Sequence, residues 1–284
     1  MLALFTGITG IAFAPILVRL SEVGPSATAG YRILLALPAF LIWRSLENRF
    51  DESPVSLHAG LRLLILTGFL FAGDLALWHW SIRFTSVANS TLFANLAPLV
   101  VTIGARIIFG ESITSRFLLG LGLCMTGAFM VAGSSLSLSL RHLWGDALGI
   151  MTALFYGGYL LCGKKLRNAY STGQVMLVSG CVAAPLLFLV AALSRESLVP
   201  QSPQGWWVLV ALALLSQVGG QALIIYGFKH LPAGFSALSL MLQPALAALL
   251  AWVLLGETLV ILQAFGGLVI LIGIAAAYRP QGTA

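Results

Sequence analysis

The sequence predicts an all-α membrane protein whose ten transmembrane helices form two inverted repeats of five helices each. Three observations predict this fold: the composition, a series of long apolar segments and an internal sequence repeat. Hydrophobic residues make up 59% of the 284 residues and charged residues only 8%, and the mean hydropathy is +0.99. Because soluble domains carry about 25% charged residues, this composition excludes a soluble globular protein.

Long apolar segments follow one another along the whole chain, with short polar joints between them. Each is long enough to cross a bilayer core of about 30 Å as a helix. The ten predicted spans are Leu2–Val18, Ala27–Trp43, Leu61–Ile82, Val87–Phe109, Phe117–Gly133, Leu143–Cys162, Val175–Leu193, Trp206–Phe228, Phe235–Leu255 and Leu259–Tyr278. The lipid bilayer is therefore the expected environment of this chain.

The chain also repeats itself. Pro98 and Glu111 recur as Pro244 and Glu257, and further pairs of residues keep the same offset of about 146 residues without a gap. A constant offset close to half of the chain length is hard to produce by compositional chance. It indicates that the protein is a duplicated unit.

The repeat boundaries follow from this offset, with the first unit at residues 1–140 and the second at 141–284. Because each unit holds an odd number of spans, the second must enter the membrane with the opposite orientation. Inverted repeats are typical of secondary transporters, since two copies that face opposite sides give two nearly equivalent states, one open inward and one open outward.

The Lys and Arg residues of the joints predict the orientation. With a cytoplasmic amino terminus, the inner joints hold Arg44, Arg49, Arg62, Arg106, Arg116, Lys164, Lys165, Arg167, Lys229 and Arg279, and the outer side holds only Arg19, Arg83, Arg141 and Arg195. We therefore expect both termini in the cytoplasm and the protein in the inner membrane of a bacterium. Because the basic residues are spread over many joints, nucleic acid is not an expected partner.

Several chemistries are not indicated. Cys124, Cys162 and Cys181 all fall inside spans, and their odd number argues against a disulfide framework or a metal cluster. The first span begins directly after Met1 and ends in Arg19, so we expect no removable signal peptide. The sequence holds no H-E-x-x-H, G-x-S-x-G or cysteine–histidine set of an enzyme, and no metal or cofactor is expected.

Three short motifs carry a family resemblance. They are the run from Ala29 to Ala36, Leu96-Ala97-Pro98 followed by Phe109-Gly110-Glu111-Ser112, and Gln243-Pro244-Ala245 followed by Leu255-Gly256-Glu257-Thr258. In this order and in these spans they resemble the EamA-type members of the drug/metabolite transporter superfamily. The resemblance implies export of small metabolites, such as amino acids, through a central cavity between the two halves. The chain departs from many relatives in its first span, where Gly10 to Pro15 contains no tryptophan.

Two features predict gating residues. Pro98 and Pro244 hold equivalent positions in the fourth and ninth spans, where each removes a backbone hydrogen bond and bends its helix, so we expect paired hinges. Arg32 is expected near the outer end of the second span, where its side chain can reach the interface. A structural or gating role for Arg32 is favoured over binding of a substrate carboxylate.

Glu111 and Glu257 are expected to be structural. Each follows a glycine at the end of a span and stands just before the next one, where a carboxylate can satisfy the free N–H groups of a helix amino terminus. The glycines Gly110 and Gly256 would permit the tight turns. Proton carriage by these acids is the alternative.

The third span carries the most suggestive polar cluster: Asp74, Trp78, His79 and Trp80. Ionisable residues at membrane depth usually face a cavity or a protein partner. An aromatic belt at the interface and pairing of Asp74 with a helix end are the structural alternatives. The positions equivalent to Asp74 and His79 hold Gly220 and Ile225, as expected when a symmetric scaffold binds an asymmetric substrate.

Amide and phenol groups of other spans complete the predicted cavity lining, because they can bind an amino-acid zwitterion without a strong fixed charge. Hydrogen bonds between helices explain them almost as well. These residues are Asn95, Tyr156, Tyr159, Gln217, Gln221 and Gln243.

The sequence thus predicts an alternating-access exporter of a small-molecule substrate, with aromatic or hydrophobic amino acids favoured by Trp78, His79 and Trp80. An exporter of other amphipathic metabolites or drugs and a channel-like facilitator are the alternatives. Coupling to protons would use Asp74 or His79, whereas a uniporter needs neither. A monomer is expected to suffice.

Overall fold

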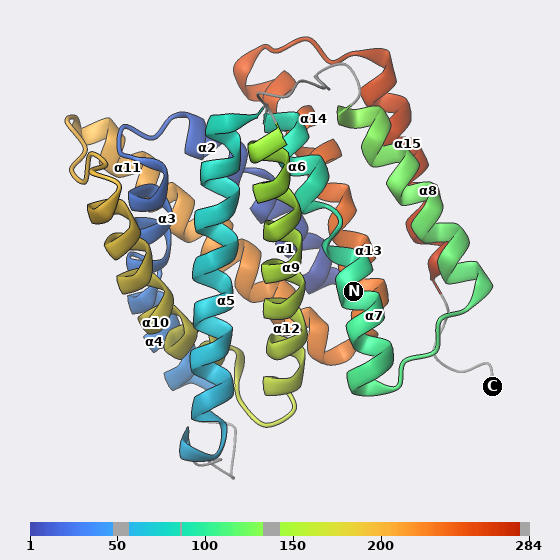
Figure 1. Cartoon of the computed structure of the whole chain (residues 1–284), viewed down its shortest axis with the longest axis horizontal. Coiled ribbons are helices and arrows are strands. Elements are labelled where there is room, and N and C mark those ends of the chain that lie inside the picture. The colour runs from blue at the N-terminus through green and yellow to red at the C-terminus, as the bar shows by residue number, and fades with distance from the viewer. Residues whose placement is uncertain (48–56, 86, 133–142, 279–284) are drawn as a thin grey trace.

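The computed structural model describes residues 1–47, 57–85, 87–132 and 143–278, and this part of the chain is helical without strands (Figure 1). Nine helical stretches of the described residues are long and apolar enough to cross a membrane, and the apolar helix Ile261–Ala277 is somewhat shorter. The structure confirms an all-helical fold with membrane-spanning elements at the predicted positions.

The first half of the chain contains α1 (Leu2–Ala12), α2 (Ala14–Arg19), α3 (Pro25–Leu34), α4 (Leu37–Glu47), α5 (Leu57–Phe84), α6 (Val87–Ala94), α7 (Ala97–Phe109) and α8 (Ser115–Ala132). The second half contains α9 (Leu143–Leu166), α10 (Thr172–Leu193), α11 (Pro203–Ala211), the π-helix η3 (Leu212–Ala222), α12 (Leu223–His230), α13 (Ala233–Ser239), the 3₁₀ turn η4 (Leu240–Leu242), α14 (Gln243–Leu255) and α15 (Ile261–Ala277).

Four predicted spans are interrupted just before a proline, at Pro15, Pro38, Pro98 and Pro244. Proline has no N–H to donate, and its ring disfavours helical geometry in the residue before it. The interruptions at Pro98 and Pro244 lie where the sequence predicts bends. Pro15 and Pro38 also break their spans, whereas Pro185 lies inside the continuous helix α10.

Helices that hold equivalent places in the two halves pack antiparallel. A Cβ atom at Gly120 would lie 2.5 Å from the carbonyl oxygen of Gly273, and one at Gly127 would lie 2.6 Å from that of Gly266. As residue numbers rise along α8, those of its contacts on α15 fall, so the two helices run in opposite directions (Figure 1). Small residues allow this close backbone approach.

The first helix of each half packs against helices of the opposite half. Helix α1 packs against η3 and α12, and its counterpart α9 packs against α5. Likewise α9 contacts α6 and α7, and α1 contacts their counterparts α13 and α14. The two halves therefore share one packing pattern.

Carboxylates of one half cap helix amino termini of the other. Glu47 accepts hydrogen bonds from the N–H groups of Thr172 (3.2 Å) and Gly173 (2.8 Å) at the start of α10. Glu196 accepts one from Ala27 N–H (3.0 Å) at the start of α3. Each cap satisfies donors that have no partner within their own helix and fastens the halves to each other.

Glu111 is a third cap of this kind, which corrects the expectation that it caps the helix that follows it. It accepts hydrogen bonds from the N–H groups of Ala233 (2.8 Å) and Gly234 (3.2 Å) at the start of α13. The reason is the left-handed turn at Gly110, with φ +68°, which ends α7 and directs the next residue across the interface. Gly256, with φ +66°, ends α14 in the same way.

Glu22 joins the two halves at the opposite end of the molecule. Its carboxylate accepts hydrogen bonds from the N–H groups of Gln201 (2.8 Å) and Ser202 (3.0 Å) and from the Ser202 hydroxyl. The hydroxyl makes the largest contribution, and together these bonds hold the pKa of Glu22 below its usual value. The ends of both halves are therefore tied through backbone groups as well as side chains.

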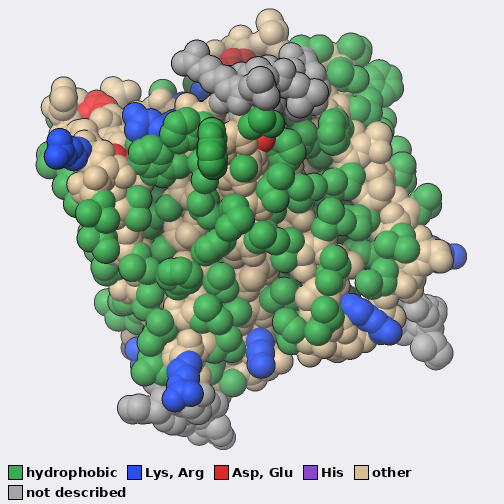
Figure 2. Space-filling model, in the orientation of Figure 1, with side chains coloured by type: hydrophobic (Ala, Val, Ile, Leu, Met, Phe, Trp, Pro, Cys, Tyr) green, Lys and Arg blue, Asp and Glu red, His purple; other side chains and the backbone are tan. Residues whose placement is uncertain are grey.

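The surface of the molecule fits a bilayer. Figure 2 shows hydrophobic side chains over the middle of the visible face, while the visible Lys, Arg, Asp and Glu side chains lie toward its edges. Exposed large apolar residues occur on most spans, among them Ile107, Leu119, Leu189, Val253 and Ile261. Soluble proteins rarely expose apolar surface on this scale, whereas membrane proteins present such surface to lipid.

The contact between α1 and η3 should not tolerate a side chain. A Cβ atom at Gly10 would lie 2.8 Å from the carbonyl oxygen of Leu215 and 2.9 Å from that of Gly219. We predict that Gly10→Val destabilises the protein by about 1–3 kcal/mol, the usual cost of overpacking, seen as a lower melting temperature in detergent. Gly122→Val is the control, because a Cβ atom there meets nothing within 4 Å. Equal melting temperatures for the two variants would contradict this prediction.

Candidate functional site

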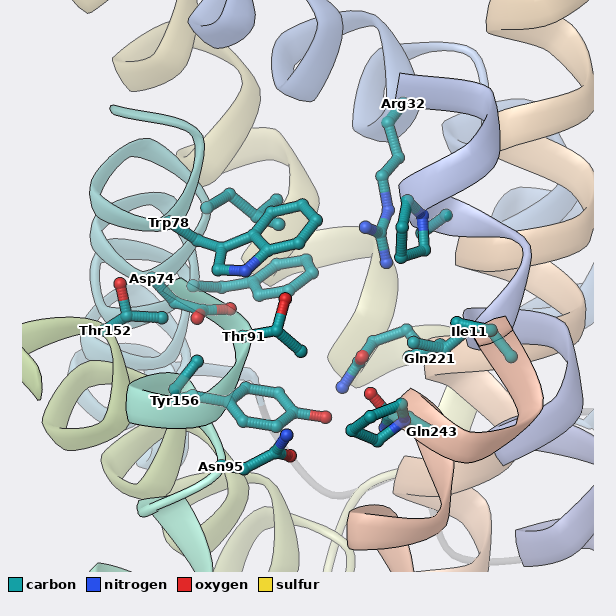
Figure 3. Close-up of a pocket in the computed structure, with 18 residues that line it drawn as sticks. Ile11, Arg32, Asp74, Trp78, Thr91, Asn95, Thr152, Tyr156, Gln221 and Gln243 are labelled. Atoms are coloured by element: carbon teal, nitrogen blue, oxygen red, sulfur yellow. The ribbon is translucent and has the colours of Figure 1, made fainter. Parts of the chain in front are cut away.

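A central cavity of about 110 Å³ lies between the two halves of the chain (Figure 3). Both halves contribute to its wall. The residues used below are Ile11 and Pro15 from the first span, Arg32 from α3, Phe71, Asp74 and Trp78 from α5, Thr91 and Asn95 from the fourth span, Thr152 and Tyr156 from α9, Gln221 from η3, and Gln243, Pro244 and Ala247 from α14.

Irregular backbone gathers around this cavity. Asn95 lies in the break after α6, Gln243 directly follows the 3₁₀ turn η4, and Gln221 lies on the π-helix η3. Within a membrane, backbone groups freed from a helix are tolerated only where protein buries them or where they line a cavity, and π-helical turns often occur at functional sites. The irregular segments therefore mark the same place as the polar side chains.

Arg32 points into the molecule. Its side chain is almost fully enclosed, with 4% of the residue exposed. Its Nε–H donates to Oε1 of Gln217 at 2.9 Å, and Nη2 donates to the Ser216 carbonyl oxygen at 3.5 Å. The expectation that Arg32 reaches toward the interface is wrong, because its hydrogen-bond acceptors lie on η3 in the protein interior. Figure 3 shows the guanidinium directed into the cavity.

Asp74 brings an acidic side chain to the same cavity. Only 7% of the residue is exposed, and among the described residues its carboxylate forms neither a hydrogen bond nor an ion pair within 4.0 Å. Arg32 attracts Asp74 at longer range. Burying a carboxylate without a direct partner costs free energy. We therefore expect Asp74 to bind a cationic group.

The amide side chains in the cavity retain unused donors. The amide nitrogens of Asn95, Gln221 and Gln243 are buried and have no acceptor in the described part of the protein. Figure 3 shows these three side chains and the Tyr156 phenol directed toward one region of the cavity. Because an unmet buried donor costs about 1–3 kcal/mol, this arrangement favours a ligand that offers hydrogen-bond acceptors.

Four residues predicted to line the cavity lie behind its wall in this structure. His79 is buried with Nδ1 2.6 Å from the Leu75 carbonyl oxygen, since it lies on another face of α5 from Asp74. The indole N–H of Trp80 donates to Ser26 Oγ at 3.1 Å. Tyr159 stacks on Phe71 with ring centroids 4.5 Å apart. Gln217 accepts a hydrogen bond from Nε–H of Arg32 and does not belong to the cavity lining. These residues support the wall.

Sequence reasoning missed two hydroxyl groups of the lining. Thr91 and Thr152 both face the cavity. Thr91 precedes Asn95 by four residues, and Thr152 precedes Tyr156 by four residues, so each pair shares one helix face. This spacing was the available signal. The structure therefore places on the cavity wall the predicted residues Arg32, Asp74, Trp78, Asn95, Tyr156, Gln221, Gln243 and Pro244, and it places Pro98 outside the wall.

Two further cavities lie toward opposite ends of the bundle. The Glu257 cavity, of about 400 Å³, includes Glu257, Arg19, Ala248 and Gln263. It shares Pro15, Thr91, Asn95, Pro244 and Ala247 with the central cavity. The central cavity therefore adjoins the cavity at this end of the molecule.

The Glu111 cavity, of about 580 Å³, has no wall residue in common with the central cavity among the described residues. Its Thr102, Glu111 and Phe117 are the repeat equivalents of Ala248, Glu257 and Gln263 in the Glu257 cavity. The two end cavities are thus corresponding regions of the two halves, yet of these two only the Glu257 cavity shares wall residues with the central cavity.

The ion pairs at the two ends of the molecule also differ, in how far their side chains are exposed. Glu111, besides capping α13, pairs with Lys164 Nζ at 3.0 Å, and Lys164 also donates to the Leu231 carbonyl oxygen at 2.7 Å. Both side chains of this pair are largely enclosed. Glu257 pairs with Arg19 at 2.8 Å, with about half of each side chain exposed. Exposed pairs contribute little, so the Glu111 end is held more firmly.

The model of the EamA-like transporter family matches this chain twice, at residues 1–133 and 143–279. The matches lie on either side of the boundary that the internal repeat predicts.

Comparison with known proteins finds transporters. The chain is 25% identical to an uncharacterized transporter of Bacillus subtilis, YyaM, over 98% of this chain and 92% of that protein. It is 23% identical to the pseudopaline exporter CntI of Pseudomonas aeruginosa, over 78% of this chain and 76% of the exporter. A solved crystal structure has the same fold, with a TM-score of 0.82 and 17% identity over 97% of this chain and 95% of that one.

Proposed function

We propose that this chain, which belongs to the EamA-like transporter family, exports small metabolites from the bacterial cytoplasm by alternating access, with amino acids as its principal cargo. Transport by the EamA family is the premise, and the cargo, the direction and the inner-membrane location are the proposal. The repeat boundary at residue 140 and the cytoplasmic position of both termini belong to the same proposal. This proposal requires only a monomer.

One observation carries the mechanism: the central cavity shares five wall residues with the Glu257 cavity and, among the described residues, none with the equivalent Glu111 cavity. Two corresponding ends in different states are what one conformation of an alternating-access transporter requires. Exchanging the roles of the two halves would open the Glu111 end and close the Glu257 end. A channel-like facilitator would be open at both ends in its conducting state, so this asymmetry favours a transporter.

Packing within the bundle supports an inverted repeat. The equivalent helices α8 and α15 run antiparallel, and the contacts of α1 and α9 exchange between the halves. With both halves in one bilayer, this arrangement gives them opposite orientations. The predicted positive-inside bias of the joints then places the Glu111 end at the cytoplasm and the Glu257 end outside.

The cavity wall supports amino acids as cargo. It combines a cation, Arg32, with an anion, Asp74, and it presents apolar surface at Ile11, Phe71 and Trp78. Opposite charges suit a zwitterion, and the apolar surface suits a hydrophobic or aromatic side chain. The relative named pseudopaline exporter supports the direction of transport. Export of other amphipathic metabolites or drugs is the second candidate, since the same wall would accept them.

We predict that proteoliposomes with the purified protein take up radiolabelled phenylalanine or tryptophan saturably, and that Trp78→Ala lowers uptake at least about tenfold, the equivalent of about 1.4 kcal/mol. The reason is loss of the aromatic surface on the cavity wall. Trp144→Ala is the matched control, because Trp144 is 76% exposed and does not belong to the cavity lining.

Uptake is compared with and without an imposed proton gradient, which separates coupled transport from uniport. Saturable transport of no amino acid would contradict the proposed cargo and favour the second candidate. Flux that does not saturate would contradict alternating access.

The Glu111 cap should hold the Glu111 end closed. Glu111→Ala removes the charged acceptor of the Ala233 and Gly234 N–H groups and also the ion pair with Lys164. Because each hydrogen bond to a charged group contributes about 1.5–3 kcal/mol, we predict at least about a tenfold shift toward opening of this end. The measurement is labelling of Thr91→Cys by an impermeant maleimide from the Glu111 side, in a background that lacks reactive native cysteines.

Glu257→Ala is the matched control, because it removes only a half-exposed pair at the end whose cavity adjoins the central one. Labelling from the Glu111 side should not rise in this variant. Equal labelling of Glu111→Ala and the parent protein would contradict a closing role for the cap.

A further inference from the structure

The polar groups of the central cavity are divided between two walls. Figure 3 shows Asp74 reaching in from one side, and Arg32, Gln221 and Gln243 from the other. The acceptor wall thus carries a carboxylate, and the donor wall carries a guanidinium with amide groups. No ion pair within 4.0 Å joins Arg32 to Asp74, although both residues are fully described. Each charge is left for a ligand that spans the cavity.

Asp74 is not required by the scaffold. Its repeat equivalent is Gly220, which packs closely against α1, where a Cβ atom would lie 2.7 Å from Cγ1 of Ile11. The half of the protein with glycine at this position uses it to bring helices together, while the half with aspartate keeps a carboxylate facing the cavity. A buried carboxylate that no packing contact needs and no cation directly pairs is expected to serve a ligand.

The donor wall is held in place by the protein. Gln217 and Ser216 accept two N–H groups of Arg32 and fix the guanidinium at the cavity edge. Next to them on η3, Gln221 is only 1% exposed, and its amide nitrogen has no acceptor in the described part of the protein. Guanidinium and amide donors on one side form a binding surface for a carboxylate.

We propose that the cavity binds its cargo as a zwitterion in one fixed orientation, with a protonated amine on Asp74 and a carboxylate on Arg32 and Gln221. This inference rests on the proposed function, because it takes the central cavity as the transport site. The apolar part of the cargo then lies along Phe71 and Trp78. Asp74, Arg32 and Gln221 are the residues that determine specificity.

Fixed orientation makes both charged groups of the cargo necessary. An amine without a carboxylate leaves the donors of Arg32 and Gln221 unmet. A carboxylate without an amine brings a second anion close to Asp74. Sites built to pair a polar group reject analogues that lack it far more strongly than sites that measure apolar size alone. We therefore expect phenylalanine to be preferred over phenylethylamine and over phenylpropanoate by at least about tenfold each.

Asp74→Asn is the test variant, since it keeps the shape of the side chain and removes its charge. Uptake of the three compounds is measured in proteoliposomes with the parent protein and with the variant. The variant should lose phenylalanine transport at least about tenfold and should shift the ratio of phenylethylamine to phenylpropanoate uptake at least about tenfold toward the carboxylate. Gln221→Leu should shift the same ratio toward the amine.

Asp146→Asn is the matched control. Asp146 is a buried carboxylate at the start of α9 that accepts a hydrogen bond from Thr85 Oγ1 at 2.9 Å and lies outside the cavity lining. The amide oxygen can still accept this bond, so the compound ratios should stay unchanged. Equal losses for all three compounds in Asp74→Asn would reduce Asp74 to a structural role and overturn the proposal, as would a parent protein that does not distinguish them.

Binding to the purified protein separates this inference from the proposed function. If the parent protein transports no amino acid, the proposed function fails, and thermal shifts with the same three compounds still test the polarity of the cavity. A shift produced by phenylethylamine in the parent protein and lost in Asp74→Asn would support the role of Asp74. Absence of any shift by amine-bearing compounds would overturn it.

Discussion

A bilayer core offers no hydrogen-bonding partner to a broken helix, and the arrangement of this protein depends on that constraint. Four spans are interrupted before prolines, and a fifth contains the π-helix η3. Three of these irregular segments, at Asn95, Gln221 and Gln243, lie on the central cavity. Freed backbone groups can exist there because neighbouring helices shield them from lipid. The same condition that confines the breaks to the interior also brings polar side chains to it.

Close helix contact is the second requirement of such an interior. Glycines on α1 and η3, and on α8 and α15, bring backbones close enough that a single added carbon would collide. These contacts hold the helices of each pair in close backbone contact. The carboxylate caps at Glu47, Glu111 and Glu196 then join one half to the other through backbone donors. At the two ends of the molecule the halves differ, because Glu111 combines a cap with an enclosed ion pair and Glu257 forms an exposed one.

Composition and periodicity were sufficient to predict the helical fold and the positions of its spans, because bilayer thickness restricts the possible structures so strongly. Proline identity predicted the breaks at Pro98 and Pro244. The direction of Arg32 could not be predicted, since it depends on Gln217 and Ser216, which lie some 185 residues away in sequence. For the same reason the sequence did not predict that Glu111 caps α13, because local sequence does not reveal which helices meet.

The internal repeat predicts scaffold positions better than it predicts the residues of the cavity lining. Positions that shape the scaffold are duplicated, such as Pro98 and Pro244 or Gly110 and Gly256, and an offset reveals them. Asp74 is paired with Gly220, and Arg32 has no basic counterpart in α10. A cargo with an amine at one end and a carboxylate at the other has no two-fold symmetry, so a site that matches it must depart from the repeat. The unduplicated polar residues on the cavity wall are therefore where chemical specificity can arise, while the duplicated residues shape the scaffold.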